Sequence, residues 1–410
     1  FGARRRLGIV DSLILITCDA APVPPVDGHN LKTIQVVRAL RPRHRLHCVV
    51  YGDDPSESRA RFEAAWGGVG SGLTLSVIRP RQRGAGTRAW LQGLTRSTVR
   101  RDFAAEAAEV ARAAASGAPV RVLVDFISGA PLVERVAGGT VISGHDCMSL
   151  LMREEARLTR SLAGRWMRRI TARRAERAER RYLHRCAAVH VVSQLDARAI
   201  SRVNPSAQVH VIPLAVEVPA PATGASSRHG RGVVWFHAGL PHHQRGVASL
   251  IRSMAPSFWS RTVLLGRLPF EAAVREVPEL APFATQYEPY ARDLESLLGE
   301  APWVLLPDVA GTGQKNRALT GMAHGCCVIG FAESFRDMPG SHGEEYLRLE
   351  NAGELGRLLE EHGESRRLRI GAHARVMVER EYSLGSCAAR WEALLAGIEP
   401  LRAGEALSGG

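Results

Sequence analysis

The fold is most clearly indicated by one stretch of the sequence, residues 303–330, which reads WVLLPDVAGTGQKNRALTGMAHGCCVIG. Its first residues, 303–307, form a short apolar run that is typical of a buried strand, and residues 326–330 form another. Between the two runs lie a glycine-containing turn and a helix-like segment, residues 318–325. A strand, a turn, a helix and a second strand in this order predict a βαβ unit with parallel strands.

The same alternation runs through the rest of the chain. A helix-like segment spans residues 31–40, and further strand-like runs lie at residues 13–17, 46–51, 120–126, 140–142, 188–192, 209–212, 232–236 and 262–265. The alternation is interrupted at residues 218–231, which are rich in proline, alanine, glycine and serine. We therefore predict two α/β domains, residues 1–217 and 232–381, joined by a linker at residues 218–231.

Length and composition limit the class of protein. A chain of 410 residues with 45% hydrophobic content is long enough to bury two cores, and its apolar runs are too short to span a membrane. The seven cysteines are odd in number and lack CxxC spacing, which argues against a disulfide framework and against structural zinc. Because the sequence shows no signal-peptide pattern, we expect a cytoplasmic protein.

The chain is strongly basic, with a formal net charge of +13. Only two of its 54 basic residues, Lys32 and Lys315, are lysines. A charge of this size is compatible with phosphate-bearing ligands or an anionic membrane surface, but it identifies neither.

Basic charge is concentrated in residues 153–185, which contain twelve arginines and four glutamates. Apolar residues recur there at every fourth position, namely Leu158, Leu162, Trp166 and Ile170. This pattern predicts a basic amphipathic helix or helix pair. We favour the interpretation in which the apolar stripe packs on its own domain. Peripheral contact with an anionic membrane is the alternative.

The quoted stretch contains the most specific candidate site. Gly311 and Gly313 lie in a turn at the carboxyl end of a predicted strand, and Lys315 and Arg317 follow at the start of a helix. α/β folds bind ligands at this edge of their sheets, and a helix N-terminus offers unpaired N–H groups to an anion. The sequence therefore predicts a phosphate site here.

Two further turns follow predicted strands. In residues 239–246, Arg245 lies near a helix start, where it is placed to bind a diphosphate. The adjacent His242 and His243 suggest a metal, but no spaced carboxylate or cysteine accompanies them, so no metal is expected. Gly28 follows a proline-rich loop and precedes a helix, which lets the backbone approach an anion. An ordinary βα turn and a solvated arginine are the alternatives.

Residues 144–146 read Gly-His-Asp and follow the strand-like run at residues 140–142. We expect this loop to face an interdomain cleft. An imidazole beside a carboxylate is able to hydrogen-bond a sugar hydroxyl and to accommodate charge that develops at a reacting carbon. His145 and Asp146 are therefore candidate catalytic residues. A structural histidine at a strand end is the alternative.

Together these motifs resemble glycosyltransferase family 4, whose members are retaining enzymes of the GT-B fold. The resemblance is carried by residues 311–313, 316–319 and 322–325, and it extends in the same order to residues 22–40, 144–150, 191–196, 212–213 and 239–246. It implies two Rossmann-like domains that face each other across a cleft. The acceptor would bind the N-terminal domain and the donor the C-terminal domain, and a last helix at about residues 382–396 would cross back.

The resemblance also implies roles by position. Gly28 would lie near the donor phosphates, Arg245 and Lys315 would hold the diphosphate, and His145 would face the reacting sugar. The full set of implied donor-binding residues is Gly28, Gly239, Arg245, Gly311, Thr312, Gly313, Lys315, Asn316, Arg317 and Thr320.

Three positions depart from the usual pattern of the resembled family. Arg317 stands where many relatives have lysine, which keeps the charge but changes its geometry. Leu240 stands where relatives usually have arginine. Thr320 stands where they usually have a glutamate that contacts the nucleotide ribose, and a hydroxyl cannot form the charge-assisted contact of a carboxylate.

The resemblance implies a transferase that moves a hexosyl or related sugar from a nucleotide-diphosphate sugar to a small-molecule or glycan acceptor, with retention. Antibiotic-like specialised metabolites, lipids and polysaccharides all stay open as acceptors. Arg245, Lys315 and the helix N-terminus would stabilise the charge on the departing nucleotide diphosphate. No cofactor is expected, and the sequence has no Asp-x-Asp motif, which agrees with metal-independent transfer.

Two other classes of protein fit parts of the sequence. Leu240 and Thr320 favour a relative that has lost catalysis and binds an anionic ligand, a membrane or nucleic acid. Aromatic residues are only 6% of the chain and we see no nucleic-acid recognition module, so nucleic acid is not the expected partner. A pyridoxal-dependent phosphorylase needs a Schiff-base lysine, whereas we place Lys32 and Lys315 in phosphate-binding loops.

Overall fold

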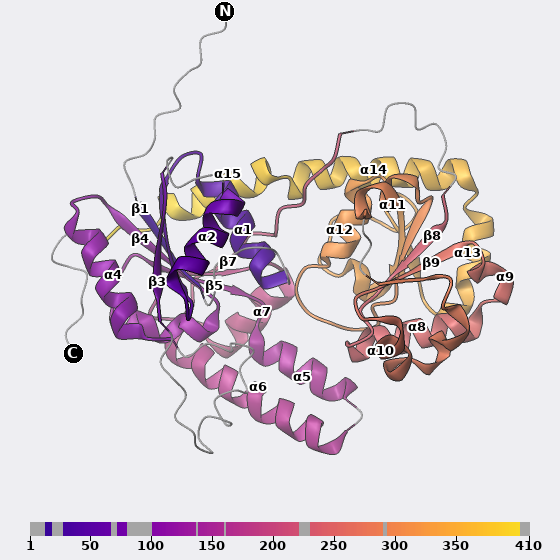
Figure 1. The fold of residues 1–410 in the computed structure, drawn as a ribbon, viewed down its shortest axis with the longest axis horizontal. Coiled ribbons are helices and arrows are strands. Elements are labelled where there is room, and N and C mark those ends of the chain that lie inside the picture. Colours follow the sequence, from indigo (N-terminus) through magenta and orange to yellow (C-terminus); the bar gives the residue numbers. More distant parts are fainter. Residues whose placement is uncertain are drawn as a thin grey trace, which may run out of the picture. The chain divides into compact units, whose positions relative to one another are not determined.

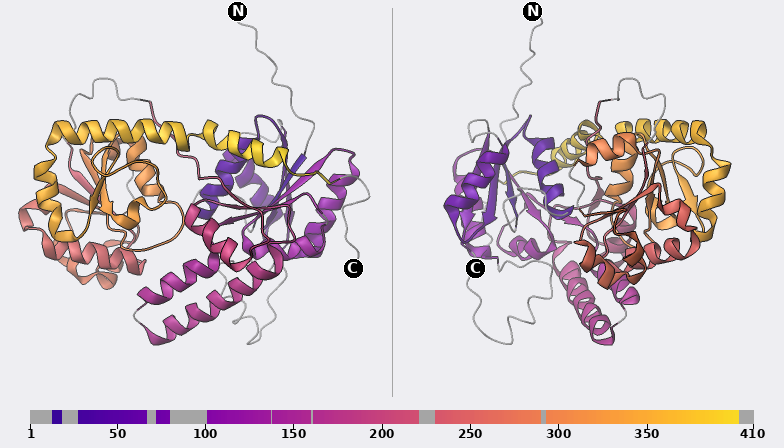
Figure 2. Two further views of the ribbon diagram at one scale, coloured as in Figure 1. Left: turned by 180° about the vertical axis from the view of Figure 1, so that it is seen from behind. Right: turned by 45° about the vertical axis from the view of Figure 1, so that its right-hand side comes forward.

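The computed structural model describes residues 13–18, 28–66, 72–79, 101–136, 138–159, 161–220, 230–289 and 293–401. The chain divides into two compact units, each built on one parallel sheet (Figures 1 and 2). The first unit comprises Phe1–Arg153, Ala163–Leu214 and Cys387–Gly410, and the second comprises Glu154–Leu162 and Ala215–Ser386. Two parallel sheets with intervening helices confirm the predicted α/β class.

The sheet of the first unit has the strand order β3-β2-β1-β4-β5-β6-β7. Its strands are β1 (Leu13–Thr17), β2 (Arg45–Tyr51), β3 (Leu73–Ile78), β4 (Val120–Asp125), β5 (Thr140–His145), β6 (Ala188–Val191) and β7 (Val209–Val211). The accompanying helices are α1 (Gly28–Leu40), α2 (Pro55–Trp66), α4 (Phe103–Ala115), α5 (Met148–Leu158), α6 (Leu162–Tyr182) and α7 (Gln194–Val203). The central strand β1 is a continuous apolar run because both faces of a parallel sheet are covered, and Ile14, Leu15 and Ile16 are fully buried.

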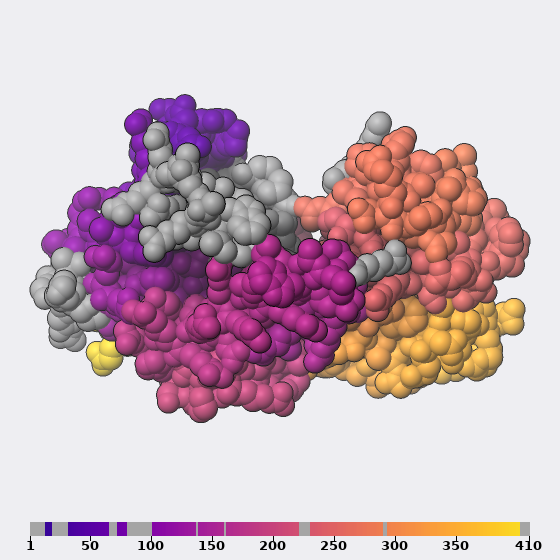
Figure 3. Space-filling view, turned by 90° about the horizontal axis from the view of Figure 1, so that it is seen from below, coloured from indigo at the N-terminus to yellow at the C-terminus, as the bar shows by residue number. Residues whose placement is uncertain are grey.

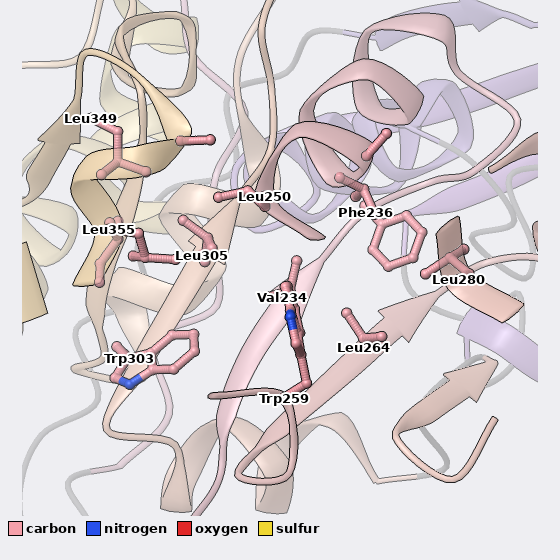
Figure 4. Close-up of a cluster of buried hydrophobic side chains, with 14 of the residues drawn as sticks. Val234, Phe236, Leu250, Trp259, Leu264, Leu280, Trp303, Leu305, Leu349 and Leu355 are labelled. Carbon is pink, nitrogen blue, oxygen red and sulfur yellow. The ribbon is translucent and has the colours of Figure 1, made fainter. Parts of the chain in front are cut away.

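The sheet of the second unit has the strand order β10-β9-β8-β11-β12-β13. Its strands are β8 (Gly232–Trp235), β9 (Thr262–Gly266), β10 (Tyr287–Pro289), β11 (Trp303–Leu306), β12 (Cys327–Phe331) and β13 (Leu347–Leu349). Its helices are α8 (Pro241–Ser253), α9 (Pro256–Trp259), α10 (Phe270–Glu276), α11 (Leu294–Glu300), α12 (Asn316–Ala323), α13 (Leu355–Glu361) and α14 (Glu364–Tyr382). In its core, Val234, Leu264 and Leu305 from three adjacent strands pack with Trp259 (Figure 4).

Each sheet contains one point where the winding of the chain changes direction. In the first unit this switch lies between the neighbouring strands β1 and β4, and in the second unit it lies between β8 and β11. The connections that leave such a pair of strands run to opposite sides, and a crevice opens outside their carboxyl ends. Topology therefore marks one candidate ligand site in each unit.

The last two helices pack on different cores. Helix α14 contributes Met377 and Val378 to a core of the second unit, and α15 (Leu384–Ala396), which begins after Ser383, contributes Trp391 and Leu394 to a core of the first. Helix α15 is the helix that the sequence places at about residues 382–396. Of the helices that the structure describes, none is both long and apolar enough to cross a membrane.

Candidate functional site

The switch point of the second unit brings two loops together. One follows β8 and leads into α8, and the other follows β11 and leads into α12. Helix α8 approaches the second loop closely, because a Cβ atom on Gly246 would lie 1.9 Å from the carbonyl oxygen of Pro307. Only glycine lets α8 pass this near to the end of β11. The loops that contain the predicted donor residues of this unit therefore share the carboxyl edge of one sheet.

A tight turn precedes α12. Gly311 and Gly313 have φ angles of 133° and 67°, in the region that favours glycine. The Lys315 side chain folds back over the turn, because its Nζ donates to the carbonyl oxygen of Thr312 at 3.4 Å and a Cβ atom on Gly311 would lie 2.6 Å from Nζ. Arg336 Nη1 donates to the Gly311 carbonyl oxygen at 3.3 Å. Two cations thus lie against the turn that leads into the helix N-terminus.

A buried carboxylate lies beneath this turn. Asp308 is 1% exposed, and its Oδ1 accepts hydrogen bonds from His243 Nε2 at 2.9 Å and from Arg317 Nη2 at 2.7 Å. Burial acts to raise the pKa of Asp308, but the charge of Arg317 and the contact with His243 outweigh it and hold that pKa far below its usual range. Asp308 is therefore an ionised anchor for Arg317.

The tautomer of His243 follows from these contacts. An ionised Asp308 has no proton to donate, so the proton between the two side chains belongs to His243 Nε2. His243 Nδ1 then accepts from the backbone N–H of His237 at 2.9 Å. The second terminal nitrogen of Arg317 is also hydrogen-bonded, because Nη1 donates to the Trp235 carbonyl oxygen at 2.9 Å. Arg317 is one of the predicted donor-binding residues, and two of its nitrogens are bound to protein acceptors.

The acid side of the stability profile is expected to depend on His243. Burial first, and then the charge of Arg317, lower its pKa from 6.5 to about 4. The unfolded chain therefore binds this proton more readily than the folded chain, and the stabilisation is complete above pH 6.5 and is lost as the pH falls toward 4. Urea midpoints measured from pH 7.5 to pH 4.5 should fall less steeply in His243→Gln than in the parent protein. Equal slopes for both proteins would contradict this assignment.

Two histidines and the same carboxylate have metal-like spacing. The ligand atoms of His242, His243 and Asp308 lie within 4.8 Å of one another. Asp308 is distant in the chain from the two histidines, so their spacing in the sequence does not reveal it as a partner. However, Arg317 Nη2 already lies 2.7 Å from both Asp308 Oδ1 and His243 Nε2. The cluster is thus occupied by a guanidinium, and we assign no metal to it.

The other predicted residues of the second unit take more peripheral positions. Arg245 is exposed on α8 and forms no ion pair with any residue that the structure describes. The Gly239 N–H donates to His237 Nδ1 at 3.1 Å. The Thr320 hydroxyl donates to the carbonyl oxygen of Asn316 at 2.8 Å, inside α12. Asn316 is the first residue of that helix.

The switch point of the first unit is filled by buried ion pairs. Lys32 is fully buried and its Nζ lies 2.5 Å from Asp125 Oδ1, while Arg101 Nη2 lies 2.7 Å from Glu106 Oε2. The prediction that Lys32 occupies a loop is wrong, because α1 begins at Gly28 and includes it. A buried lysine paired with aspartate still gives no support to a Schiff base. The proline-rich loop at residues 19–27, which precedes Gly28, lies outside the described residues.

His145 ends β5 in a left-handed backbone conformation, with φ of 66°, at an irregularity in its pairing with β6. Such strain in a residue other than glycine is concentrated at functional sites. Its Nε2 lies 3.8 Å from Asp146 Oδ2, and the two side chains are 16% and 14% exposed. The backbone of Cys147, which follows Asp146, is fixed by the buried Asp196, because the Cys147 N–H donates to Asp196 Oδ1 at 2.8 Å. The two candidate catalytic residues are therefore adjacent on a restrained loop.

Asp308 and Arg336 are not among the residues predicted from the sequence. Asp308 directly follows a predicted buried strand. A charged residue at the carboxyl end of such a strand is a sequence feature that indicates a candidate site residue. Arg336 lies far beyond the quoted glycine turn, and only the return of the chain through β12 brings it to Gly311.

No protein-family model matches the chain, and neither does any curated protein sequence. Solved structures do match. HepE from Anabaena, in complex with UDP and glucose, superposes with a TM-score of 0.63 at 13% identity, over 94% of this chain and 99% of that one. Sucrose-phosphate synthase from Thermosynechococcus elongatus gives 0.63 at 14% identity, over 94% and 98%. The α,α-trehalose 6-phosphate synthase of Burkholderia multivorans gives 0.58 at 12% identity, over 94% and 98%. These likenesses show the fold, which is of the predicted GT-B class with two Rossmann-like units.

Proposed function

We propose that this protein transfers a sugar from a nucleotide-diphosphate sugar to an acceptor. The observation that carries the proposal is the glycine turn at the switch point of the second unit, with Lys315 and Arg336 against it and α12 behind it. A half-buried glycine turn, two cations and a helix N-terminus suit a diphosphate. The solved complexes of HepE with UDP and with UDP-glucose support a nucleotide sugar as the ligand class.

The roles of the cations differ. The ammonium of Lys315 lies against the glycine turn, and it contacts a phosphate oxygen of the bound donor. Arg317 is held inward by Asp308 and the Trp235 carbonyl oxygen, and it shapes the floor of the site and adds positive potential. Arg245 is exposed, its Nη2 donates to the Leu158 carbonyl oxygen at 3.5 Å, and it supplies a further cation. Together they stabilise the negative charge that accumulates on the departing nucleoside diphosphate.

The finer parts of the proposal come from the resemblance to glycosyltransferase family 4. His145 and Asp146 contact the reacting sugar, transfer proceeds with retention and without a metal, and a hexosyl group is moved. The acceptor is a small molecule or a glycan, with antibiotic-like metabolites included. The strained backbone at His145 is the structural feature that supports a functional role for that residue.

Nucleotide binding is the direct test. We expect UDP, GDP or TDP at about 100 times its dissociation constant to stabilise the protein by roughly 2.7 kcal/mol, which is visible as a rise of several degrees in the thermal midpoint. Lys315→Ala should bind the preferred nucleotide about 10-fold more weakly by calorimetry, because one charge-assisted contact is lost.

Arg275→Ala is the matched control for Lys315→Ala. Arg275 is an exposed cation on α10 of the same unit and forms no ion pair with a described residue. The Arg275→Ala variant should bind the preferred nucleotide with the parent affinity. If Lys315→Ala also retained that affinity, the diphosphate would not lie at the glycine turn. If no nucleoside diphosphate bound at all, the transferase proposal would fail.

A further inference from the structure

Helix α6 has a continuous exposed face that sugar transfer does not explain. Leu162, Trp166, Arg169, Arg173 and Arg177 recur at intervals of three or four residues, so they lie on one side of the helix. All five are exposed, Leu162 to 78% and Trp166 to 62%. We call these five residues the α6 stripe. Their exposure corrects the favoured sequence interpretation, in which Leu162 and Trp166 pack on their own domain.

The stripe is not needed to hold α6 in place. Helices α5 and α6 lie side by side (Figures 1 and 2), and they are joined through other residues of α6. Met152 packs with Ala172, and the Ser149 N–H donates to Glu179 Oε1 at 3.0 Å. Glu179 is 1% exposed. Neither Ala172 nor Glu179 belongs to the stripe, so α6 is anchored by other residues while the five stripe side chains stay exposed.

The arginines of the stripe differ from their neighbours in their ion pairs. Arg180 pairs with Glu176, and both Arg181 and Arg185 pair with Glu134. By contrast, no ion pair joins Arg169, Arg173 or Arg177 to any residue in the described part of the chain. The stripe therefore presents two large apolar side chains followed by three arginines that no acidic residue among those the structure describes pairs with.

We propose that the α6 stripe docks this protein on an anionic lipid bilayer. Leu162 and Trp166 enter the interfacial region, where an amphipathic indole is favoured, and the three arginines contact anionic headgroups. The face of the protein that includes the magenta α5 and α6 helices is drawn in Figure 3. An exposed leucine and tryptophan beside the arginines favour a bilayer over nucleic acid. Binding to a phosphate backbone depends on charge, and it gains nothing from burying these apolar side chains.

Vesicle flotation tests the proposal on the full chain. The parent protein should float with vesicles that contain phosphatidylglycerol and not with pure phosphatidylcholine vesicles, and binding should weaken as salt is raised. Changing Arg169, Arg173 and Arg177 together to Gln should reduce partitioning on the order of 100-fold, since each arginine near an anionic surface contributes about fivefold. Leu162→Ser combined with Trp166→Ser should reduce it at least tenfold at unchanged charge.

The matched control removes three charges elsewhere. Arg59, Arg202 and Arg261 are exposed and unpaired among the described residues, and changing all three to Gln should alter partitioning less than threefold. Equal losses in the control and in the stripe variant would overturn the proposal, because general charge would then explain binding. An unchanged Leu162→Ser, Trp166→Ser variant would also overturn it. The proposal would also be overturned if the protein bound a DNA duplex more tightly than vesicles and this binding depended on the three arginines alone. Circular dichroism and the nucleotide midpoint shift would verify that each variant is folded.

Discussion

Replacing His145 with alanine is expected to slow sugar transfer about 100-fold or more while nucleoside diphosphates bind with the parent affinity. A polar side chain that contacts the reacting sugar acts mainly in the transition state, and such contributions are typically 10²–10⁴-fold. The nucleotide is expected to contact the glycine turn of the second unit, which does not contain His145. Initial rates of release of nucleoside diphosphate, together with calorimetry on the same preparations, would measure both quantities.

The backbone at His145 offers a control for a purely structural role. With φ of 66°, this position favours glycine, so His145→Gly should fold at least as stably as His145→Ala. If the imidazole acts on the sugar, both variants lose activity to a similar extent. Recovery of activity in His145→Gly would instead show that the loop conformation matters and the imidazole does not. Weaker nucleotide binding in both variants would contradict the separation of roles.

Asp308→Ala is expected to lower the free energy of unfolding by about 3 kcal/mol or more. Removal of one member of a buried ion pair leaves the other without its partner, and losses of about 3–5 kcal/mol are typical. Here both Arg317 Nη2 and His243 Nε2–H lose their shared acceptor. Urea unfolding followed by circular dichroism would measure the change at pH 7.

A double variant separates the ion pair from a simple cavity. Arg317→Met removes the guanidinium but keeps much of the apolar bulk of the side chain. If Arg317 is the charge that Asp308 balances, Asp308→Ala combined with Arg317→Met should lose less stability than the sum of the two single changes, by at least 1 kcal/mol. Strict additivity would show that the two side chains are not coupled.

Much of the α/β architecture could be predicted locally. The apolar runs at residues 13–17 and 303–307 are strands, and the turn at Gly311 and Gly313 is a glycine turn because its φ angles exclude most other residues. Hydrophobic periodicity and backbone sterics act over a few residues, so a single sequence is enough to predict the local structure that they produce. The helix-like segment predicted at residues 31–40 begins earlier, at Gly28, because a proline-rich loop does not reveal the residue at which the next helix begins.

The sequence by itself determined that the chain forms two parallel α/β units and that a glycine turn with a following cation ends one strand of the second. Only the tertiary structure decided what those groups touch. Arg317 was predicted as a donor-binding residue, and its neighbours Asp308 and His243 lie beside it because β8 and β11 are adjacent in the sheet. The exposure of Trp166 could not be predicted from the sequence either. Helical periodicity shows which residues share a face of the helix, but it does not show which face is covered. Burial and pairing depend on contacts between segments that are distant in the chain, and these contacts are set by how the elements pack.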